Sequence, residues 1–250
     1  MTVHFVGAGP GAADLLTVRA TGLLAAADVV LYPGTYLDPG VAAHVNPDAT
    51  LIDTQDLDLD QITGHLVSAH RVGKATVRLA SGDLSVYSAL SEQTRRLDEA
   101  GVPWDVTPGV PAYAAAAALV GRELTVPLLS QSVVLTRTQA RSTAMPETES
   151  LAAFAATKAT LVLHLAITRT RALMNEIEPH YGADCPAVVV YRATQPGELV
   201  LRGTVATIAD AVEAAGLRQA AVILVGRALD PRPGGESYLY DAARERDTAH

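Results

Sequence analysis

The sequence predicts an α/β protein built from two α/β domains. Short apolar runs alternate with helical patterns along most of its 250 residues, several of these runs end in glycine-containing turns, and nearly half of the residues are apolar while few are aromatic. Strands that alternate with helices through short connections favour a mainly parallel sheet covered by helices on both faces. A chain of this length can bury a large core in one or two domains.

The first half of the chain predicts one such sheet. Its strands are expected at 3–6, 29–32, 51–53, 76–79 and 104–107. Its helices are expected at 17–27, 62–72 and 85–100. An alanine-rich helix that ends at Gly121 and a connector over 124–127 come next. We therefore expect a first domain over 1–118.

The second half continues the alternation without an obvious sequence repeat. Its strands are expected at 132–135, 160–164, 187–191, 198–204 and 220–225. Its helices are expected at 151–157, 170–180 and 208–215. We therefore expect a second domain over 124–240, followed by a charged and disordered tail over 241–250.

The bulk properties exclude several classes of protein. The net charge of −8 argues against nucleic-acid binding, and an anionic small ligand would need local arginines. The longest uncharged stretch, 106–121, is shorter than the roughly 20 residues of a membrane span and contains prolines. The N-terminus lacks the pattern of a signal peptide, and the single cysteine, Cys185, rules out an internal disulfide or thiolate cluster. We expect a soluble, cytoplasmic protein without a metal site.

A glycine-rich turn, Gly7–Gly11, follows the first expected strand and precedes a helix. A dinucleotide-binding loop is the first alternative, but the third glycine comes one residue early and Pro10 removes an amide donor. The second strand also ends in Leu31–Gly34, without the acidic residue that would hold a ribose. The turn is either a tight structural turn or one that lines a ligand crevice.

Two more turns follow strands of the same sheet, at Ser81–Asp83 and Thr107–Ala112. Asp83 is either the N-cap of the next helix or a ligand contact, with Gly82 allowing close approach of the backbone. In a parallel sheet the carboxyl ends of the strands face the ligand crevice. Three glycine-containing strand ends therefore predict the rim of a binding site.

Taken in order, these motifs resemble the tetrapyrrole methylase family. The segments that carry the resemblance are Val6–Gly11, Leu15–Val18, Ala27–Tyr32, Ser81–Asp83 and Thr107–Val110. The resemblance extends over nearly the whole chain, to about Tyr240. Three later segments resemble the branch of the family that methylates precorrin-4, or its cobalt-containing form, at carbon 11. These segments are Ser130–Arg137, Val190–Pro196 and Gly226–Pro231.

The resemblance implies a homodimer of two-domain subunits that bind S-adenosylmethionine in a cleft between the domains, release S-adenosylhomocysteine and act on a tetrapyrrole in cobalamin biosynthesis. The implied cofactor contacts of the first domain are Pro10, Ser81, Gly82, Asp83, Val86, Pro111 and Ala112. Those of the second domain are Leu165, Ala193 and Ala221. Uroporphyrinogen-methylating members have an acid where this chain has Pro33, which puts transfer of their acid–base proposal in doubt and favours the precorrin-4 branch.

Methyl transfer to carbon requires alignment of the reactants and exclusion of water more than it requires a catalytic triad or a metal. The carboxylates of a tetrapyrrole are natural partners of guanidinium groups, and Arg78, Arg137 and Arg192 stand at expected strand ends, although solvated surface arginines are the alternative. Candidates for shaping the pocket or accepting a proton are Tyr32, Tyr36, Tyr87 and His164. The sequence does not choose among them.

Other readings stay open at this point. Within the family they are another precorrin methylase or an enzyme like diphthine synthase. Outside it they are a non-catalytic binding module and, least favoured because of Pro10, a nicotinamide oxidoreductase. The sequence does not decide whether the substrate contains cobalt.

Overall fold

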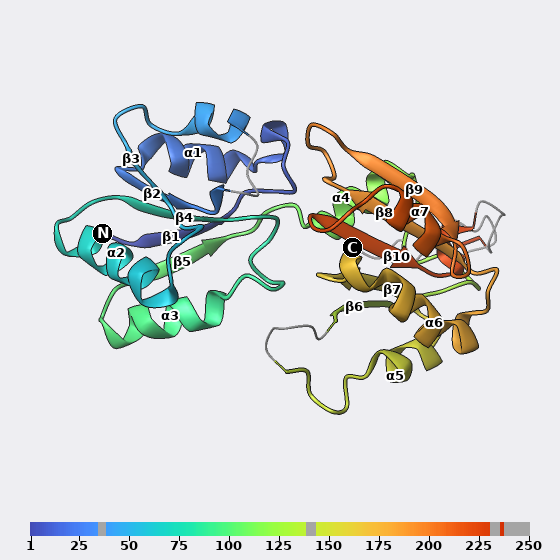
Figure 1. Ribbon diagram of the computed structural model, residues 1–250. Helices are drawn as coiled ribbons and strands as arrows, with labels where there is room; N and C mark the ends of the chain where they lie inside the picture. Colours follow the sequence, from blue (N-terminus) through green and yellow to red (C-terminus); the bar gives the residue numbers. More distant parts are fainter. Residues whose placement is uncertain (35–38, 139–143, 231–235, 238–250) are drawn as a thin grey trace, which may run out of the picture. The chain divides into compact units, whose positions relative to one another are not determined.

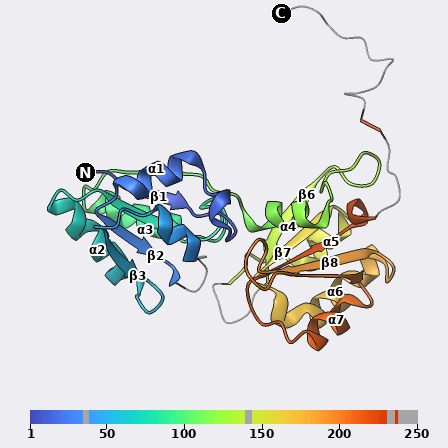
Figure 2. The ribbon, with the colours of Figure 1, turned by 90° about the horizontal axis from the view of Figure 1, so that it is seen from above.

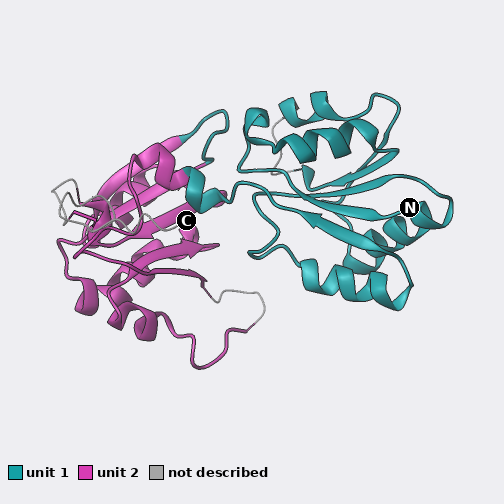
Figure 3. Ribbon diagram, turned by 180° about the vertical axis from the view of Figure 1, so that it is seen from behind, with its two compact units in different colours: residues 1–115, 192–198 teal, residues 116–191, 199–250 magenta. Residues whose placement is uncertain are grey.

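The computed structural model describes residues 1–34, 39–138, 144–230 and 236–237. The chain divides into two compact units, Met1–Ala115 with Arg192–Glu198, and Ala116–Tyr191 with Leu199–His250 (Figure 3). The segment Arg192–Glu198 lies in sequence between two second-half strands, Pro186–Tyr191 and Leu199–Thr204, but groups with the first unit, which the sequence did not indicate. The tail expected over 241–250 lies outside the described residues.

The first unit is built on a five-stranded parallel sheet (Figure 1). The strands are β1 (Val3–Gly7), β2 (Val29–Tyr32), β3 (Thr50–Asp53), β4 (Thr76–Ala80) and β5 (Trp104–Thr107). Their order is β3-β2-β4-β1-β5, and every neighbouring pair is parallel. All five carboxyl ends therefore lie along one edge of the sheet, and the turns after β4, β1 and β5 are neighbours there.

Helices cover both faces of this sheet. Helix α1 (Val18–Ala26) packs through Leu24 on a cluster that contains Val6, Val77 and Leu79. The other face carries a second cluster, to which α2 (Leu59–Arg71) and α3 (Leu90–Glu99) contribute. Successive residues of a strand point to opposite faces of the sheet. Because helices bury both faces, most residues of these strands are apolar, which explains the near-continuous apolar runs in the sequence.

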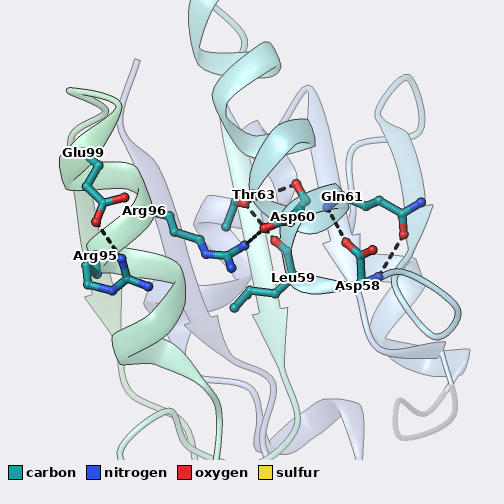
Figure 4. Close-up of polar contacts among 8 residues, drawn as sticks. All are labelled: Asp58, Leu59, Asp60, Gln61, Thr63, Arg95, Arg96 and Glu99. Carbon is teal, nitrogen blue, oxygen red and sulfur yellow. Dashed lines mark hydrogen bonds and ion pairs between the residues drawn. The ribbon is translucent and has the colours of Figure 1, made fainter.

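Helix α2 begins three residues earlier than the sequence predicted, because a capping box was overlooked. The Asp58 side chain accepts from the Gln61 N–H, and the Gln61 side chain accepts from the Asp58 N–H (Figure 4). Arg96 of α3 pairs with Asp60 of α2 across the two helices (Figure 4). The Asp60 side chain is exposed, so this pair contributes little to stability.

Helix α3 begins at Leu90, five residues later than predicted. An irregular turn over 81–89 occupies the expected first part of the helix, and the N-cap is Ala89, so the N-cap reading of Asp83 is wrong. Tyr87 and Ala89 have left-handed backbone angles, with φ of 55° and 54°. Each costs about 1–2 kcal/mol in a residue with a Cβ atom. Local strain is therefore concentrated directly after β4.

The second unit contains a mixed five-stranded sheet. Its strands are β6 (Val133–Arg137), β7 (Thr160–His164), β8 (Pro186–Tyr191), β9 (Leu199–Thr204) and β10 (Ala221–Val225), in the order β6-β7-β10-β8-β9. Only β6 and β7 pair in parallel, and β10 runs antiparallel to both of its neighbours. The sequence located these strands but did not predict their directions.

The helices of the second half are α4 (Ala112–Val120), α5 (Leu151–Ala156), α6 (Thr170–Tyr181) and α7 (Ile208–Ala214). One large apolar cluster joins the last three helices to a face of the second sheet. Figure 2 shows these helices beside the strands of that sheet. Cys185 is fully buried at the entry to β8 and belongs to this cluster. Among the described residues, no helix has the length and apolar character that would let it cross a membrane.

Candidate cofactor-binding site

The three glycine-containing turns of the first unit meet backbone to backbone. A Cβ atom added to Gly7 would lie 2.5 Å from the Gly109 nitrogen and 2.8 Å from the Gly82 oxygen. A Cβ atom on Gly109 would lie 2.3 Å from the Gly82 oxygen. Such distances leave room only for hydrogen, so glycine is required for the contact. Gly9 and Gly82 also exchange two backbone hydrogen bonds, of 3.1 and 2.7 Å.

Asp83 ties two of these turns together. Its Oδ2 accepts from the Gly109 N–H at 2.8 Å, and its Oδ1 accepts from the N–H and the hydroxyl of Ser85. Partial burial by itself would raise the pKa of Asp83, but the hydrogen bonds from the Ser85 side chain and from backbone N–H groups outweigh it and lower the pKa. The rim of the turns therefore carries a fixed negative charge at neutral pH.

Ser81 and Val86 belong to the turn after β4, and Pro111 and Ala112 lie at the start of α4. Ser81 is exposed and Val86 is half-buried. A Cβ atom on Gly82 would lie 3.7 Å from the Ala112 nitrogen and 3.9 Å from the Pro111 Cα, which is ordinary van der Waals contact. The turn after β4 thus faces the start of α4, and Gly82, Pro111 and Ala112 are brought together.

The segment 192–198 holds the Gly-rich turn from a distant part of the sequence. Gln195 Nε2 donates to the Pro10 oxygen at 2.7 Å, and Thr194 Oγ1 accepts from the Ala12 N–H at 3.1 Å. A Cβ atom on Gly11 would lie 2.1 Å from Gln195 Cγ, so these two residues are packed against each other. Ala193, a predicted cofactor contact, is buried within this same segment. Sequence reasoning missed Thr194 and Gln195, because no local pattern signals a contact with the first turn.

In the second unit, the predicted residues share one end of the sheet. Arg137 and His164 are paired in the register of β6 and β7, and Leu165 follows directly with φ of 53° and 67% exposure. Ala221 is the first residue of β10 and pairs with Tyr191, the last residue of β8. Burial lowers the pKa of His164, which keeps its imidazole neutral at pH 7.

The comparisons with known proteins decide the family. A model of the family described as Tetrapyrrole (Corrin/Porphyrin) Methylases matches residues 2–209, which is most of the chain. The chain belongs to the tetrapyrrole methylase family.

Individual relatives of this tetrapyrrole methylase are similar over their whole length. A precorrin-4 C(11)-methyltransferase from Rhodococcus erythropolis is 52% identical over 248 residues, which are 99% of this chain and 100% of the relative. The crystal structure of a cobalt precorrin-4 methyltransferase has a TM-score of 0.89 and 41% identity, with 92% of this chain and 96% of the other covered. A uroporphyrin-III C-methyltransferase from Thermus thermophilus, complexed with S-adenosylhomocysteine, has a TM-score of 0.77 and 27% identity, with 92% and 99% covered.

The turns of this methylase fit S-adenosylmethionine chemically. The cofactor carries positive charge on its sulfonium and its amino group, and the ionised Asp83 lies on the rim. At Gly82 no side chain separates the turn after β4 from the backbone nitrogen of Ala112, which would lie 3.7 Å from an added Cβ atom, while the N–H and oxygen of Gly82 itself are bonded to Gly9. Close approach of backbone to a ligand is a regular use of glycine.

Two of the predicted residues have positions that the sequence did not indicate. Arg78 is only 9% exposed, and its guanidinium donates to Gln93 Oε1 and to the Leu79 oxygen inside the first unit. Tyr87 is 47% exposed on the strained turn after β4. Tyr32 is half-buried at the end of β2, and Tyr36 lies outside the described residues.

A carboxylate stands beside the turn after β2, where sequence reasoning found no acid. Asp53 at the end of β3 is paired in register with Tyr32, and its Oδ1 accepts from the N–H groups of Gly34 and Gln55 at 3.1 and 2.9 Å. The acid comes from the neighbouring strand and not from the turn itself. The signal that could have found it is the parallel pairing of the two strands.

Proposed function

We propose that this chain transfers a methyl group from S-adenosylmethionine to carbon 11 of precorrin-4, giving precorrin-5 and S-adenosylhomocysteine in cobalamin biosynthesis. The full-length similarity to a precorrin-4 C(11)-methyltransferase supports the substrate. The observation that carries the chemistry is the close backbone contact of Gly7, Gly82 and Gly109, with the ionised Asp83 beside it.

The cofactor, when bound, supplies an electrophilic methyl group that needs no further activation. The residues proposed to hold it in the first unit are Pro10, Ser81, Gly82, Asp83, Val86, Pro111, Ala112 and Ala193. Those proposed in the second unit are Leu165 and Ala221. Their work is to orient the reactants, which can contribute as much as about 7–11 kcal/mol to lowering the barrier.

Arg137 and Arg192 are the proposed partners of the substrate carboxylates, since guanidinium groups bind carboxylates in a bidentate manner. Arg78 is less suited to this role, because its guanidinium is buried and already donates to Gln93 and Leu79. His164 is the first candidate to take the proton released from the methylated carbon. Its lowered pKa keeps the imidazole unprotonated and able to accept. Tyr32 and Tyr87 are the alternatives.

We also propose that the chain forms a homodimer in the cytoplasm. The family resemblance supports the dimer, and the single buried cysteine fits a reducing compartment. Light scattering coupled to size-exclusion chromatography measures the mass directly. A mass of one chain across the micromolar range would contradict the dimer.

The test of the function is an anaerobic turnover assay with precorrin-4 and, separately, cobalt-precorrin-4. Release of S-adenosylhomocysteine and a gain of one methyl group in the product mass are followed together. The cobalt form is the second candidate substrate, because the similar crystal structure is of a cobalt precorrin-4 methyltransferase. Cofactor binding without methylation of either substrate would contradict the assignment.

The same assay tests the proton acceptor. His164→Gln is expected to lower kcat, whereas His180→Gln, at a half-buried position in the last turn of α6, is the matched control and should retain the parent rate. Equal rates for the two variants would exclude His164 and leave the tyrosines.

A further inference from the structure

A buried polar pair, Arg78 and Gln93, joins β4 to α3 behind the turn over 81–89. Arg78 Nε donates to Gln93 Oε1 at 3.1 Å, and Arg78 Nη1 donates to the Leu79 oxygen at 2.8 Å. Both partners of the guanidinium are neutral oxygens. Burial lowers the pKa of Arg78 to about 10, so the group still carries its charge at neutral pH. A buried charge without a carboxylate partner is costly, which calls for a reason to keep it.

Arg78 fixes the orientation of the Gln93 amide. A guanidinium can only donate, so Gln93 must turn Oε1 toward it, and the amide nitrogen then faces the other way. Gln93 Nε2 donates to the Ala89 oxygen at 3.1 Å and lies 3.5 Å from the Ser88 oxygen. These acceptors are backbone carbonyls and cannot donate. The network therefore has a single hydrogen-bonding arrangement that runs from the strand to the turn.

The carbonyls that Gln93 holds belong to the strained part of the turn. Tyr87 and Ala89, on either side of Ser88, both have positive φ. Such conformations persist only where surrounding structure holds them. Ser88 adds one more contact, since its hydroxyl donates to the Leu84 oxygen. Gln93 is thus placed to maintain the shape of the segment that carries Val86 and Tyr87.

We propose that Arg78 and Gln93 are positioning residues for cofactor binding: Arg78 orients the Gln93 amide, and Gln93 holds the strained turn in the shape that binds S-adenosylmethionine. This inference rests on the proposed cofactor contacts of the turn, at Ser81, Gly82 and Val86. It gives the buried arginine a role other than a substrate contact.

The variant that isolates this role is Gln93→Glu. A carboxylate still accepts from Arg78 and compensates its charge, but it cannot donate to the Ala89 and Ser88 oxygens. We expect the dissociation constant of S-adenosylhomocysteine, measured by calorimetry on the folded protein, to rise on the order of tenfold, as loss of one hydrogen bond allows. Thr94→Val is the matched control: Thr94 is also buried on α3, but its hydroxyl donates to the Ser91 oxygen of the same helix. It should lose stability and keep the dissociation constant within about twofold of the parent.

A second substitution makes the test independent of general destabilisation. Glycine adopts positive φ without a steric cost, so Ala89→Gly added to Gln93→Glu should recover much of the lost affinity. Parent affinity in Gln93→Glu, or equal losses in Gln93→Glu and Thr94→Val, would overturn the inference.

Ser81→Leu separates this failure from failure of the proposed function. Ser81 is exposed on the same turn and is a proposed direct contact, so the larger side chain should block the cofactor. If Ser81→Leu binds S-adenosylhomocysteine as the parent does, the proposed site is wrong. If it does not bind while Gln93→Glu does, only the positioning role is wrong.

Discussion

Replacing Gly109 by alanine tests the central packing feature of the site. The added Cβ atom would lie 2.3 Å from the Gly82 oxygen and 2.8 Å from the carbonyl carbon and oxygen of Gly7. All of these are backbone atoms, so no side-chain rotation relieves the overlap. The turn after β5 must move away from the turns after β1 and β4.

The expected loss of stability follows from the packing and the hydrogen bond that such a movement disturbs. Forcing extra volume into a packed region costs about 1–3 kcal/mol. The Gly109 N–H also loses its 2.8 Å bond to the Asp83 carboxylate, and a bond to a charged group contributes about 1.5–3 kcal/mol. We therefore expect Gly109→Ala to lower the free energy of unfolding by about 3–5 kcal/mol, a large part of the 5–15 kcal/mol typical of a folded domain.

Urea unfolding followed by circular dichroism measures this change, and calorimetry with S-adenosylhomocysteine measures its effect on binding. Gly64→Ala is the matched control, because Gly64 lies on an exposed face of α2 and an added Cβ atom there meets nothing within 4 Å. It should raise stability by about 0.5–1 kcal/mol, since alanine favours the helix. If Gly109→Ala unfolds at the urea concentration of the parent and binds the cofactor product normally, the argument from glycine contact is refuted.

Three further outcomes are expected. Gly11→Ala should weaken S-adenosylhomocysteine binding in calorimetry, because the added Cβ atom would lie 2.1 Å from Gln195 Cγ. Adding Gln195→Ala to this variant removes the overlapping side chain and should restore part of the lost affinity. If no affinity is restored, the contact between Gly11 and Gln195 is contradicted. Because burial lowers the pKa of His164, the unfolded chain binds a proton at a higher pH than the folded chain, so this contribution to stability is full above about pH 6.5 and is lost as the pH falls toward the lower folded value. In urea unfolding, His164→Gln should therefore lose stability less steeply than the parent between about pH 7 and pH 5, and identical slopes would argue against the buried neutral histidine. The Cys185 thiol is fully buried and burial raises its pKa to about 11, so iodoacetamide at about pH 8 should modify it only after unfolding, as mass spectrometry would show.

The sequence located most of the strands because burial on both faces of a sheet leaves a local record. Runs such as Val29–Tyr32 and Thr160–His164 are apolar over a strand length and are bounded by turn residues, and the structure has strands over these same residues. The three glycine-containing turns could be predicted for a similar reason, since each one directly follows an apolar run of strand length. Helix starts were less well predicted, because α3 is delayed to Leu90 by a turn whose left-handed residues carry no glycine signal.

The sequence by itself therefore determined the α/β class, the family and the turns that line the candidate site. Only the tertiary structure decided which atoms meet. Strand order places Gly7, Gly82 and Gly109 in contact, and it places Asp53 beside the turn after β2. The tertiary structure also places the Arg78 side chain in the interior of the first unit, where it donates to Gln93. The physical reason is that local patterns record burial and turn geometry, whereas contacts between distant segments depend on the pairing and direction of strands, which no local pattern contains.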